Sequence, residues 1–381
     1  MGDFEIPASK SYLNRALILA ALNPRKVTIE GVSACDDVID MMNALGELGV
    51  DIKVDARKTI VFNSLQGGLE SRVIRVGEGG TTIRFLIALC ALYHEEVEIQ
   101  CHPRFLQRPL IEYQYALETL GVRVDVRDHS IFVTGPYKKK MVEVNCQRST
   151  QFYSALKLVE SKGGFKISAK NLISSQTYIK LTHKLIEFAD EEHIPIMADM
   201  SSASFLLCYG AIFGHVKIRN VERDSYQADA KVFAILESLG CCLTVEEGWL
   251  EVIPPKTFRP LEFDMSDCLD LVPALSFTLA LSNQKHKLTG LENLIHKESD
   301  RLNGVKDLLS KFGILVKVLG GVMTIDGVKN SELARVKEVN PFADHRLVML
   351  AALLIKASGG GVVMNSETIA KSFPEFVKFV R

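Results

Sequence analysis

Four similar segments of the chain combine an apolar helix-like run with two stretches in which apolar and polar positions alternate. A glycine separates the helix-like run from the alternating stretches, and these glycines are Gly49, Gly121, Gly240 and Gly313. Glycine readily takes the left-handed conformation that ends a helix. Each segment is therefore predicted to form the end of a helix followed by a β-hairpin.

The spacing of the four glycines indicates a repeat that is interrupted once. Gly121 follows Gly49 by 72 residues, and Gly313 follows Gly240 by 73 residues. A third step of 72 residues from Gly121 leads to His193, where a degenerate copy of the segment lacks the glycine. The distance from His193 to Gly240 is too short for another full repeat. The pattern predicts two α/β domains built from units of roughly seventy residues. The crossover is expected within residues 198–204, near Asp199.

Four predicted apolar helices begin with groups of polar residues. Each Ser, Thr or Asp has a simple explanation as a cap for free N–H groups. Three of the groups also contain Lys or Arg, and a cation beside the positive end of a helix favours phosphate or carboxylate binding. Several such groups indicate a pair of ligands rich in negative charge. The groups are Ser9–Ser11 with Arg15, Gly77–Thr82 with Arg84, Arg148–Gln151, and Asp199 with Ser201, Ser202 and Ser204.

A second set of charged residues lies near predicted helix starts in the last third of the chain. Lys297, Glu298 and Arg301 precede an amphipathic helix and are close enough in sequence to share one face. One interpretation is an ordinary surface ion pair. The other is a site that holds an anion with Lys and Arg and moves a proton with Glu. Further charged residues at element ends are Asp267, Asp270, Asp344, His345, Arg346 and Lys371.

Composition restricts the classes of function. The 381 residues include 47% hydrophobic and 24% charged residues, which is typical of a globular protein. The net charge of -1 argues against extended nucleic-acid or anionic-membrane binding. The longest apolar runs, 85–93 and 271–281, are shorter than the ~18 residues of a membrane span, and the acidic start is not typical of a signal peptide. Eight scattered cysteines without a CxxC motif indicate reduced thiols in a cytoplasmic protein and no zinc site.

Taken in chain order, these groups resemble the 5-enolpyruvylshikimate-3-phosphate synthase family, whose members are also called 3-phosphoshikimate 1-carboxyvinyltransferases. The resemblance spans nearly the whole chain, and its most specific strings are KESDR at 297–301 and DHR at 344–346. The matching residues are Lys10, Ser11, Arg15, Gly80, Thr81, Arg84, Arg108, Pro109, Ser149, Thr150, Gln151, Asp199, Ser201, Ser202, Asp270, Lys297, Glu298, Arg301, Asp344, His345, Arg346 and Lys371.

The resemblance implies an α/β fold of two similar domains, each an inside-out α/β barrel of three βαβαββ-type units. Residues 9–198 are expected to form the first domain, which binds shikimate phosphate. Residues 1–8 and 199–381 are expected to form the second domain, which mainly binds phosphoenolpyruvate. The active site is expected in the cleft between the domains.

The resemblance also implies the reaction, an addition–elimination in chorismate and aromatic amino-acid biosynthesis. The 5-hydroxyl of shikimate-3-phosphate attacks C2 of phosphoenolpyruvate while C3 gains a proton, and phosphate then leaves. The implied partners are these two substrates, with no cofactor and no metal, and glyphosate is the family's inhibitor. We expect no nucleic-acid or membrane partner and take a monomer as the default.

Individual roles follow from the resemblance. Asp270 and Glu298 match the proton-transfer pair, with Asp270 assigned to the 5-hydroxyl and Glu298 to the methylene carbon, and Lys10 is expected to assist. Since Lys and Arg surround Glu298, its use as an acid requires burial or substrate charge to raise its pKa. Residues that match shikimate-3-phosphate contacts are Ser11, Arg15, Ser149, Thr150, Ser175, Tyr178, Asn293 and Lys297. Residues that match phosphoenolpyruvate contacts are Lys10, Gly80, Arg84, Arg108, Gln151, Arg301, Arg346 and Lys371, and His345 is a further substrate-binding candidate.

Several residues depart from the family pattern, among them Met197 and Ala198, which stand where Glu and Gly are usual before Asp199. Glu78 stands where asparagine is usual, and its charge is expected to repel phosphoenolpyruvate unless Arg108 or Arg148 pairs with it. Phe85 replaces a usual proline, and Arg148 stands where small residues are common. We therefore expect weaker binding of phosphoenolpyruvate or glyphosate than is usual for the family.

Two other functions stay open. A UDP-N-acetylglucosamine enolpyruvyl transferase would share the architecture and often uses a loop cysteine, for which Cys101 is the only candidate here. An anion-binding homologue without activity is the other alternative. Glu78 favours the inactive homologue, whereas the presence of both Asp270 and Glu298 argues against it.

Overall fold

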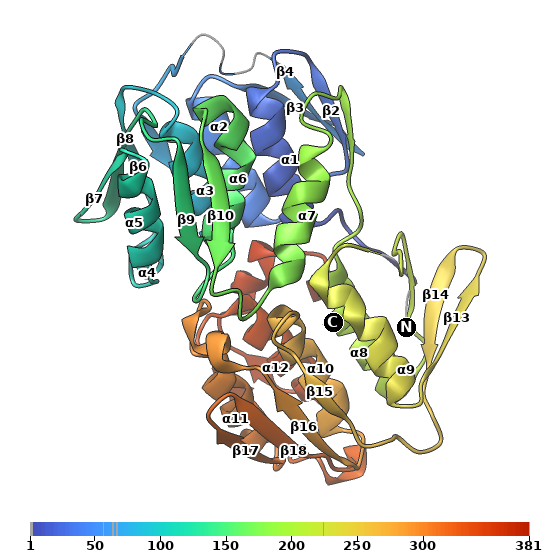
Figure 1. The fold of residues 1–381 in the computed structure, drawn as a ribbon. Helices are drawn as coiled ribbons and strands as arrows, with labels where there is room; N and C mark the ends of the chain where they lie inside the picture. The colour runs from blue at the N-terminus through green and yellow to red at the C-terminus, as the bar shows by residue number, and fades with distance from the viewer. Residues whose placement is uncertain (1–2, 56, 63–64, 66–67, 224, 381) are drawn as a thin grey trace. The chain divides into compact units, whose positions relative to one another are not determined.

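The computed structural model describes residues 3–55, 57–62, 65, 68–223 and 225–380 and divides the chain into two compact units (Figure 1). The first unit is Ala8–Met197, and the second unit combines Met1–Pro7 with Ala198–Arg381. Residues 1, 2 and 381, which the predicted second domain includes, lie outside the described residues.

The described part of the first unit contains two four-stranded sheets and one two-stranded sheet. Each four-stranded sheet joins a parallel pair of strands to an antiparallel hairpin, in the orders β11-β2-β4-β3 and β5-β6-β8-β7. Strands β9 and β10 form a parallel pair. The strands are β2 (Val27–Glu30), β3 (Asp51–Asp55), β4 (Lys58–Phe62), β5 (Val73–Arg75), β6 (Glu96–Gln100), β7 (Arg123–Arg127), β8 (Ser130–Thr134), β9 (Met141–Asn145), β10 (Lys166–Lys170) and β11 (His193–Pro195).

The second unit repeats this arrangement of sheets within its described residues. Its four-stranded sheets have the orders β1-β12-β14-β13 and β15-β16-β18-β17, again with one parallel pair and one hairpin in each. Strands β19 and β20 form the parallel pair. The strands are β1 (Asp3–Glu5), β12 (Lys217–Arg219), β13 (Cys242–Glu246), β14 (Trp249–Ile253), β15 (Glu262–Asp264), β16 (Lys285–Thr289), β17 (Leu315–Leu319), β18 (Val322–Asp326), β19 (Glu338–Val339) and β20 (Val362–Val363).

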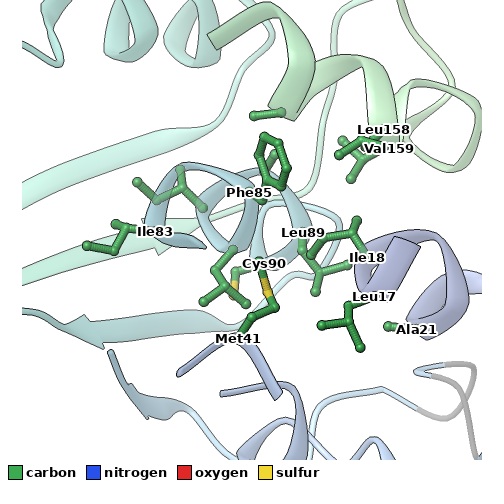
Figure 2. Packing of buried hydrophobic residues seen from close by; sticks show 14 of the residues in the cluster. Leu17, Ile18, Ala21, Met41, Ile83, Phe85, Leu89, Cys90, Leu158 and Val159 are labelled. Atoms are coloured by element: carbon green, nitrogen blue, oxygen red, sulfur yellow. The ribbon is translucent and has the colours of Figure 1, made fainter. Parts of the chain in front are cut away.

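Helices α1, α3 and α6 pack against one another in the core of the first unit. Helix α3 buries ten of its eleven residues, because an apolar sequence on all sides is stable only when surrounded by protein. Figure 2 shows side chains in this core, including Leu17, Met41, Phe85 and Leu158. The helices are α1 (Lys10–Leu22), α2 (Asp36–Glu47), α3 (Gly80–Cys90), α4 (Pro103–Leu106), α5 (Ile111–Thr119), α6 (Gln151–Gly163) and α7 (Gln176–Ile186).

Helices α8, α10 and α12 have the corresponding role in the second unit, where α10 packs against both of the others. Every residue of α10 is buried. The α-helices are α8 (Met200–Phe213), α9 (Val232–Ser238), α10 (Val272–Ala280), α11 (Arg301–Lys311), α12 (His345–Ala357) and α13 (Phe376–Val380). Short 3-10 helices are η2 (Ala228–Lys231), η3 (Leu269–Leu271), η4 (Glu292–His296), η5 (Asn330–Glu332) and η6 (Ser366–Lys371).

The four hairpins predicted from the glycine pattern are confirmed as β3–β4, β7–β8, β13–β14 and β17–β18. The preceding glycines all have left-handed backbone conformations, with φ of 106° at Gly49, 88° at Gly121, 101° at Gly240 and 85° at Gly313. The degenerate copy at His193 forms the single strand β11, which pairs in parallel with β2.

Helix starts follow the polar groups that predicted them. Helices α1, α3, α6, α8, α11 and α12 begin within or directly after these groups. No helix among the described residues is both long enough and apolar enough to cross a membrane.

Candidate functional site

Three candidate phosphoenolpyruvate residues lie around a fourth, Gly80 at the start of α3, which has no room for a side chain. A Cβ at Gly80 would lie 2.6 Å from Arg108 Nη1 and 3.0 Å from Arg84 Nη1. Arg84 Nη1 donates to Gln151 Oε1 at 2.5 Å, and Gln151 Nε2 donates to Thr81 Oγ1 at 3.0 Å. Two guanidinium groups at a helix N-terminus favour the binding of an anion.

Aromatic side chains support the Arg84 guanidinium. Its Cζ atom lies 5.4 Å from the ring centre of Phe105 and 5.1 Å from that of Phe152. Tyr113 donates from its hydroxyl to the Arg84 carbonyl at 2.8 Å and stacks on Phe152. Aromatic faces attract a guanidinium, so these rings help to hold Arg84 in place.

Two aspartates of α2 shape the glycine-rich loop, and sequence reasoning missed both. Asp40 Oδ2 accepts from the Gly77 amide at 2.9 Å, and Asp37 Oδ2 lies 2.8 Å from Lys10 Nζ. A Cβ at Gly77 would lie 2.5 Å from Asp40, and one at Gly79 would lie 2.7 Å from Asp37. Their spacing of three residues on a helix was a signal, but acids near a helix start are usually assigned to its dipole or cap.

Arg15 is a buried cation that contacts only neutral acceptors among the described residues. Its Nε donates to Thr182 Oγ1 at 2.8 Å, its Nη1 to Ser11 O at 2.7 Å and its Nη2 to Ser154 Oγ at 3.4 Å. Burial lowers the pKa of Arg15 to about 10. A buried charge without a counter-charge is unfavourable, so a bound anion would stabilise this arrangement.

The candidate shikimate-phosphate residues lie near the starts of α6 and α7, which pack together. Thr150 Oγ1 donates to Ser175 O at 3.3 Å, and Ser149 Oγ accepts from the Gln151 amide at 3.2 Å. Tyr178 lies in the first turn of α7, with its ring centre 5.9 Å from Arg15 Cζ. The first unit therefore brings hydroxyl groups and a buried guanidinium together.

Capping differs among the helices that begin in the predicted polar groups. Within the described chain, the N-cap side chains of α1 and α6, Ser9 and Thr150, make no capping hydrogen bond, and the N-cap of α3 is Gly79. Capping is therefore confirmed for Asp199 but is wrong for Ser9 and Thr150. Free N–H groups at a helix start can bind an anion. Among the helices that begin in the predicted polar groups, α8, α11 and α12 are capped by Asp199, Asp300 and Asp344, which accept from the amides of Ser202, Asn303 and Arg346 at 2.7, 3.1 and 3.0 Å.

Arg301 organises the candidate site of the second unit. It is 0% exposed, and its guanidinium bonds three carboxylates. Nη1 donates to Asp270 Oδ1 at 2.8 Å and Nη2 to Glu298 Oε2 at 2.5 Å. Nε and Nη2 donate to the two oxygens of Asp344 at 3.1 and 3.2 Å. No catalytic or substrate-binding role was predicted for Asp344. It fixes the Arg301 guanidinium, which binds both Asp270 and Glu298.

Further cations surround this pair of carboxylates. Lys297 Nζ and Arg346 Nε lie 3.2 and 3.7 Å from Asp270 Oδ1. Lys371 Nζ lies 3.8 Å from Glu298 Oε1. Burial acts to raise the pKa of Asp270, but the charges of Lys297, Arg346 and Arg301 outweigh it and hold that pKa well below its ordinary value. Asp270 is therefore ionised at neutral pH.

The last two candidate residues, Asn293 and His345, are also buried in the second unit. Asn293 lies on η4, which ends next to Lys297. His345 opens α12 beside Arg346. Groups of three or more His, Cys, Asp or Glu side chains suited to a metal ion do not occur in the described part of the chain.

Three of the residues that depart from the family pattern contact charged or aromatic side chains. Glu78 lies 3.8 Å from Arg104 and 3.9 Å from His102, two residues that sequence reasoning did not name. Arg148 lies 3.3 Å from Glu112. Phe85 is buried in α3, and Arg15 Cζ is 5.2 Å from its ring centre. Phe85 therefore supports the buried Arg15 directly.

Cys101 lacks the properties of a reactive loop cysteine. It is buried, and its Sγ lies 3.9 Å from the His129 carbonyl. Burial raises the pKa of Cys101 to about 11, so the thiol is protonated at neutral pH. Nucleophilic attack requires the thiolate, which argues against the cysteine-dependent alternative.

These features define the class of protein: a two-unit α/β protein with two arginines close to a helix-start glycine in one unit and an arginine-bound pair of carboxylates in the other. The family model described as EPSP synthase (3-phosphoshikimate 1-carboxyvinyltransferase) matches residues 1–192 and 189–379. The chain belongs to this family.

Curated relatives and solved structures agree with this assignment. The chain is 32% identical over 398 residues to a 3-phosphoshikimate 1-carboxyvinyltransferase of Pyrococcus abyssi, covering 98% of this chain and 93% of the relative. It is 28% identical over 404 residues to one from Dehalococcoides mccartyi, covering 98% and 94%.

Two solved structures share the fold. An EPSP synthase from Acinetobacter baumannii has a TM-score of 0.79 at 20% identity, covering 99% of this chain and 94% of that chain. The enolpyruvyl transferase NikO from Streptomyces tendae has a TM-score of 0.72 at 14% identity, covering 100% and 94%. These similarities confirm the predicted α/β fold with two domains.

Proposed function

We propose that the chain transfers the enolpyruvyl group of phosphoenolpyruvate to the 5-hydroxyl of shikimate-3-phosphate and releases phosphate, the reaction for which its family is named. Membership of the family supports this activity. The observation that carries it is that one guanidinium, that of Arg301, binds both Asp270 and Glu298. Addition followed by elimination needs one group that accepts a proton and one that donates a proton.

The cations of both units have a purpose in this reaction. Each substrate carries phosphate and carboxylate groups, so the two substrates repel each other when held in contact. Arg84 and Arg108 at Gly80, with Gln151, are suited to phosphoenolpyruvate, and Arg301, Arg346 and Lys371 are proposed to complete its contacts. Fixed positive groups offset the repulsion and hold the reacting atoms close. The proposal requires that the groups of both units engage the same pair of substrates.

Shikimate-3-phosphate is proposed to bind the residues around Arg15. The buried guanidinium has only neutral acceptors in the described chain, which supports a role as the partner of a substrate anion. Ser149, Thr150 and Ser175 offer hydroxyl groups for its phosphate. Ser11, Tyr178, Asn293 and Lys297 are the remaining proposed contacts, and His345 is a further candidate.

Proton transfer is proposed to depend on the substrate charges. In the free protein, Lys297 and Arg346 keep Asp270 ionised and weakly basic. When substrate anions neutralise these cations, the basicity of Asp270 rises and it can accept the proton of the 5-hydroxyl. Glu298 donates the proton to C3. Lys10, 2.8 Å from Asp37, is proposed to assist.

The test is phosphate release from phosphoenolpyruvate, measured with and without shikimate-3-phosphate. We expect release only when both substrates are present. Asp270→Asn and Glu298→Gln should each lower kcat by roughly 10²- to 10⁴-fold while the melting temperature stays near that of the wild type. Asp307→Asn, an exposed acid on α11, is the matched control and should retain full activity. Full activity in both acid variants would rule out the assigned proton transfers.

The same assay separates the alternatives. Turnover with UDP-N-acetylglucosamine in place of shikimate-3-phosphate would identify the sister activity. Tight binding of shikimate-3-phosphate in calorimetry without phosphate release would identify an inactive anion-binding homologue.

We further propose that the three sheets of each unit correspond to three βαβαββ-type units of an inside-out barrel. The parallel pair and hairpin that recur in four of the sheets support this repeat. We also propose a monomer, which analytical ultracentrifugation would test, and a cytoplasmic location.

A further inference from the structure

Ser154 and Thr182 are two buried hydroxyl residues to which the proposed reaction assigns no role. Ser154 lies on α6 and Thr182 on α7, and both helices pack against α1, which carries Arg15. Both residues are 0% exposed. A buried hydroxyl group needs a hydrogen-bond partner, and each of these two has the Arg15 guanidinium as a partner.

The Thr182 hydroxyl joins Arg15 to two other groups. Its oxygen accepts from Arg15 Nε at 2.8 Å, and it lies 2.8 Å from the Tyr178 carbonyl oxygen and 2.9 Å from Ser154 Oγ. Ser154 Oγ in turn accepts from Arg15 Nη2 at 3.4 Å. A hydroxyl group carries one hydrogen and two lone pairs, so Thr182 can accept from the guanidinium while it donates to Tyr178 or Ser154. The two hydroxyl groups therefore fix the side of the guanidinium that carries Nε and Nη2.

Arg15 and Arg301 are both fully buried, but their guanidinium groups have opposite electrostatic surroundings. Arg301 bonds three carboxylates, which compensate its positive charge. Among the described residues, Arg15 is held instead by two hydroxyl groups and the Ser11 carbonyl, which carry no charge. Neutral acceptors fix the direction of a guanidinium without cancelling its charge, so Arg15 can still bind an anion strongly.

The same hydrogen bonds leave part of the Arg15 guanidinium for a ligand. A guanidinium has five N–H groups. In the described chain, Arg15 uses its Nε–H, one N–H of Nη1 and one N–H of Nη2. One N–H therefore remains on each terminal nitrogen, and two such groups can bind two oxygens of one carboxylate or phosphate.

We propose that Thr182 and Ser154 are positioning residues for Arg15, which hold its guanidinium in the orientation that binds an anionic group of a substrate and leave its charge uncompensated. Thr182 has the larger part, because its bond to Arg15 is the shorter one and because it also contacts the Tyr178 carbonyl. The identity of the substrate as shikimate-3-phosphate rests on the proposed function.

The first test compares Thr182→Val with Thr182→Ser in the full chain. Valine keeps the shape of threonine but removes the hydroxyl group, whereas serine keeps the hydroxyl group. We expect calorimetry to show that shikimate-3-phosphate binds about tenfold more weakly to Thr182→Val, which loses a hydrogen bond to a charged group, and within about threefold of wild type to Thr182→Ser. The KM for phosphoenolpyruvate at saturating shikimate-3-phosphate should change by less than about twofold in both variants, since the lost bond does not reach Arg84.

Thr119→Val is the matched control. The Thr119 hydroxyl on α5 donates to the carbonyl four residues earlier in its helix at 2.7 Å, and Thr182 lies at the same spacing from the Tyr178 carbonyl. Thr119→Val should therefore leave the binding of shikimate-3-phosphate unchanged. Equal loss of affinity in Thr182→Val and Thr182→Ser, or no loss in either, would overturn the proposal. If Thr182→Val does not fold, Ser154→Ala should weaken binding about threefold through loss of the longer bond to Nη2, and unchanged binding would then overturn the proposal.

A second test needs no substrate and so separates this proposal from the proposed function. Nitrogen-15 NMR of the Arg15 Nε–H group in the free protein reports on its hydrogen bond to Thr182. We expect this hydrogen to exchange with water about tenfold faster or more in Thr182→Val than in Thr182→Ser. Equal exchange rates would show that Thr182 does not hold the guanidinium, whatever the activity. Faster exchange in Thr182→Val, together with a wild type that does not bind shikimate-3-phosphate, would refute the proposed function and leave the positioning of Arg15 standing.

Discussion

Opposite charges and excluded volume position the side chains of the candidate site residue by residue. Asp37 holds Lys10, and Asp344 holds Arg301, which in turn holds Asp270 and Glu298. Gly80 contributes through the absence of a side chain, since two guanidinium groups occupy the space that a Cβ would need. Small changes at such positions should affect ligand binding more than folding.

Gly80→Ala tests the close approach at the start of α3. The new Cβ would lie 2.6 Å from Arg108 Nη1, and because that atom ends a flexible side chain, the guanidinium can move aside. We expect the KM for phosphoenolpyruvate to rise about tenfold or more through loss of a charge-assisted hydrogen bond, with little change in melting temperature. Gly46→Ala, where a Cβ meets nothing within 4 Å, is the control. An unchanged KM in Gly80→Ala would contradict the assignment of Arg108.

Glu78→Asn tests whether this acid weakens the binding of phosphoenolpyruvate. Its neighbours Arg104 and His102 lie 3.8 and 3.9 Å away and are both exposed, and solvent weakens ion pairs at exposed positions. We expect the KM for phosphoenolpyruvate to fall several-fold at low ionic strength and the difference to shrink as salt is added. Steady-state kinetics at two salt concentrations would measure this. Glu118→Gln, at an exposed position on α5, serves as the control, and no difference between the two variants would reject repulsion by Glu78.

Phe85→Pro tests the role of Phe85 on α3, which stands where the family usually has proline. Phe85 packs against Arg15 from inside α3, and proline cannot donate the helical hydrogen bond there. We expect changed kinetic constants for phosphoenolpyruvate, changed glyphosate inhibition and a lower melting temperature, and Phe85→Leu as control should alter all of these less. Identical constants in wild type and Phe85→Pro would refute a role for this residue in binding.

At the scale of elements, each hairpin and helix start follows from a short sequence, but buried polar groups connect elements that are distant in sequence. His286 on β16 is an example outside the candidate site. Its Nδ1 accepts from the Leu261 amide at 3.1 Å, so its Nε2 carries the proton and donates to Ser282 Oγ at 2.6 Å. This neutral tautomer satisfies both ring nitrogens inside the protein.

His286 should make the stability of the second unit depend on pH. Burial lowers its pKa from the ordinary value of 6.5 to about 4. Between these values the unfolded chain binds a proton that the folded chain does not, so the free energy of unfolding falls as pH decreases, by about 3 kcal/mol in all. His286→Gln, which keeps one donor and one acceptor, should remove most of this dependence in urea unfolding. The exposed His215→Asn is the control; equal slopes for His286→Gln and the wild type would contradict this account.

At the scale of the whole molecule, each unit has its own buried helices. The continuous core around α1, α3 and α6 is built from residues of the first unit alone. Helices α8, α10 and α12 provide the buried apolar surface of the second. Chains with separate cores often unfold in more than one step.

Core truncation in either unit tests this independence. Leu17→Ala and Leu350→Ala each remove a fully buried side chain, one from each unit, and each should cost roughly 2–5 kcal/mol. We expect calorimetry to resolve two transitions and each variant to lower only one of them. A single transition that both variants lower equally would show that the units unfold together.

Local sequence pattern is sufficient for the elements of this protein. The glycines before the hairpins and the polar groups at the helix starts could be read directly, because a glycine's backbone freedom and the period of a strand act over a few residues. The string KESDR likewise brings Glu298 and Arg301 together, since residues three apart share one face of a turn.

Long-range packing is required for the pairing of charges. Lys10 and Asp37 are 27 residues apart, and Arg301 and Asp344 are 43 apart, so neither pair follows from local spacing. Packing also buried the Asp229 carboxyl and left Arg15 with neutral hydrogen-bond acceptors only in the described chain. Electrostatic energy depends on distance in space and on burial, and both are properties of the folded chain that residue order alone does not contain.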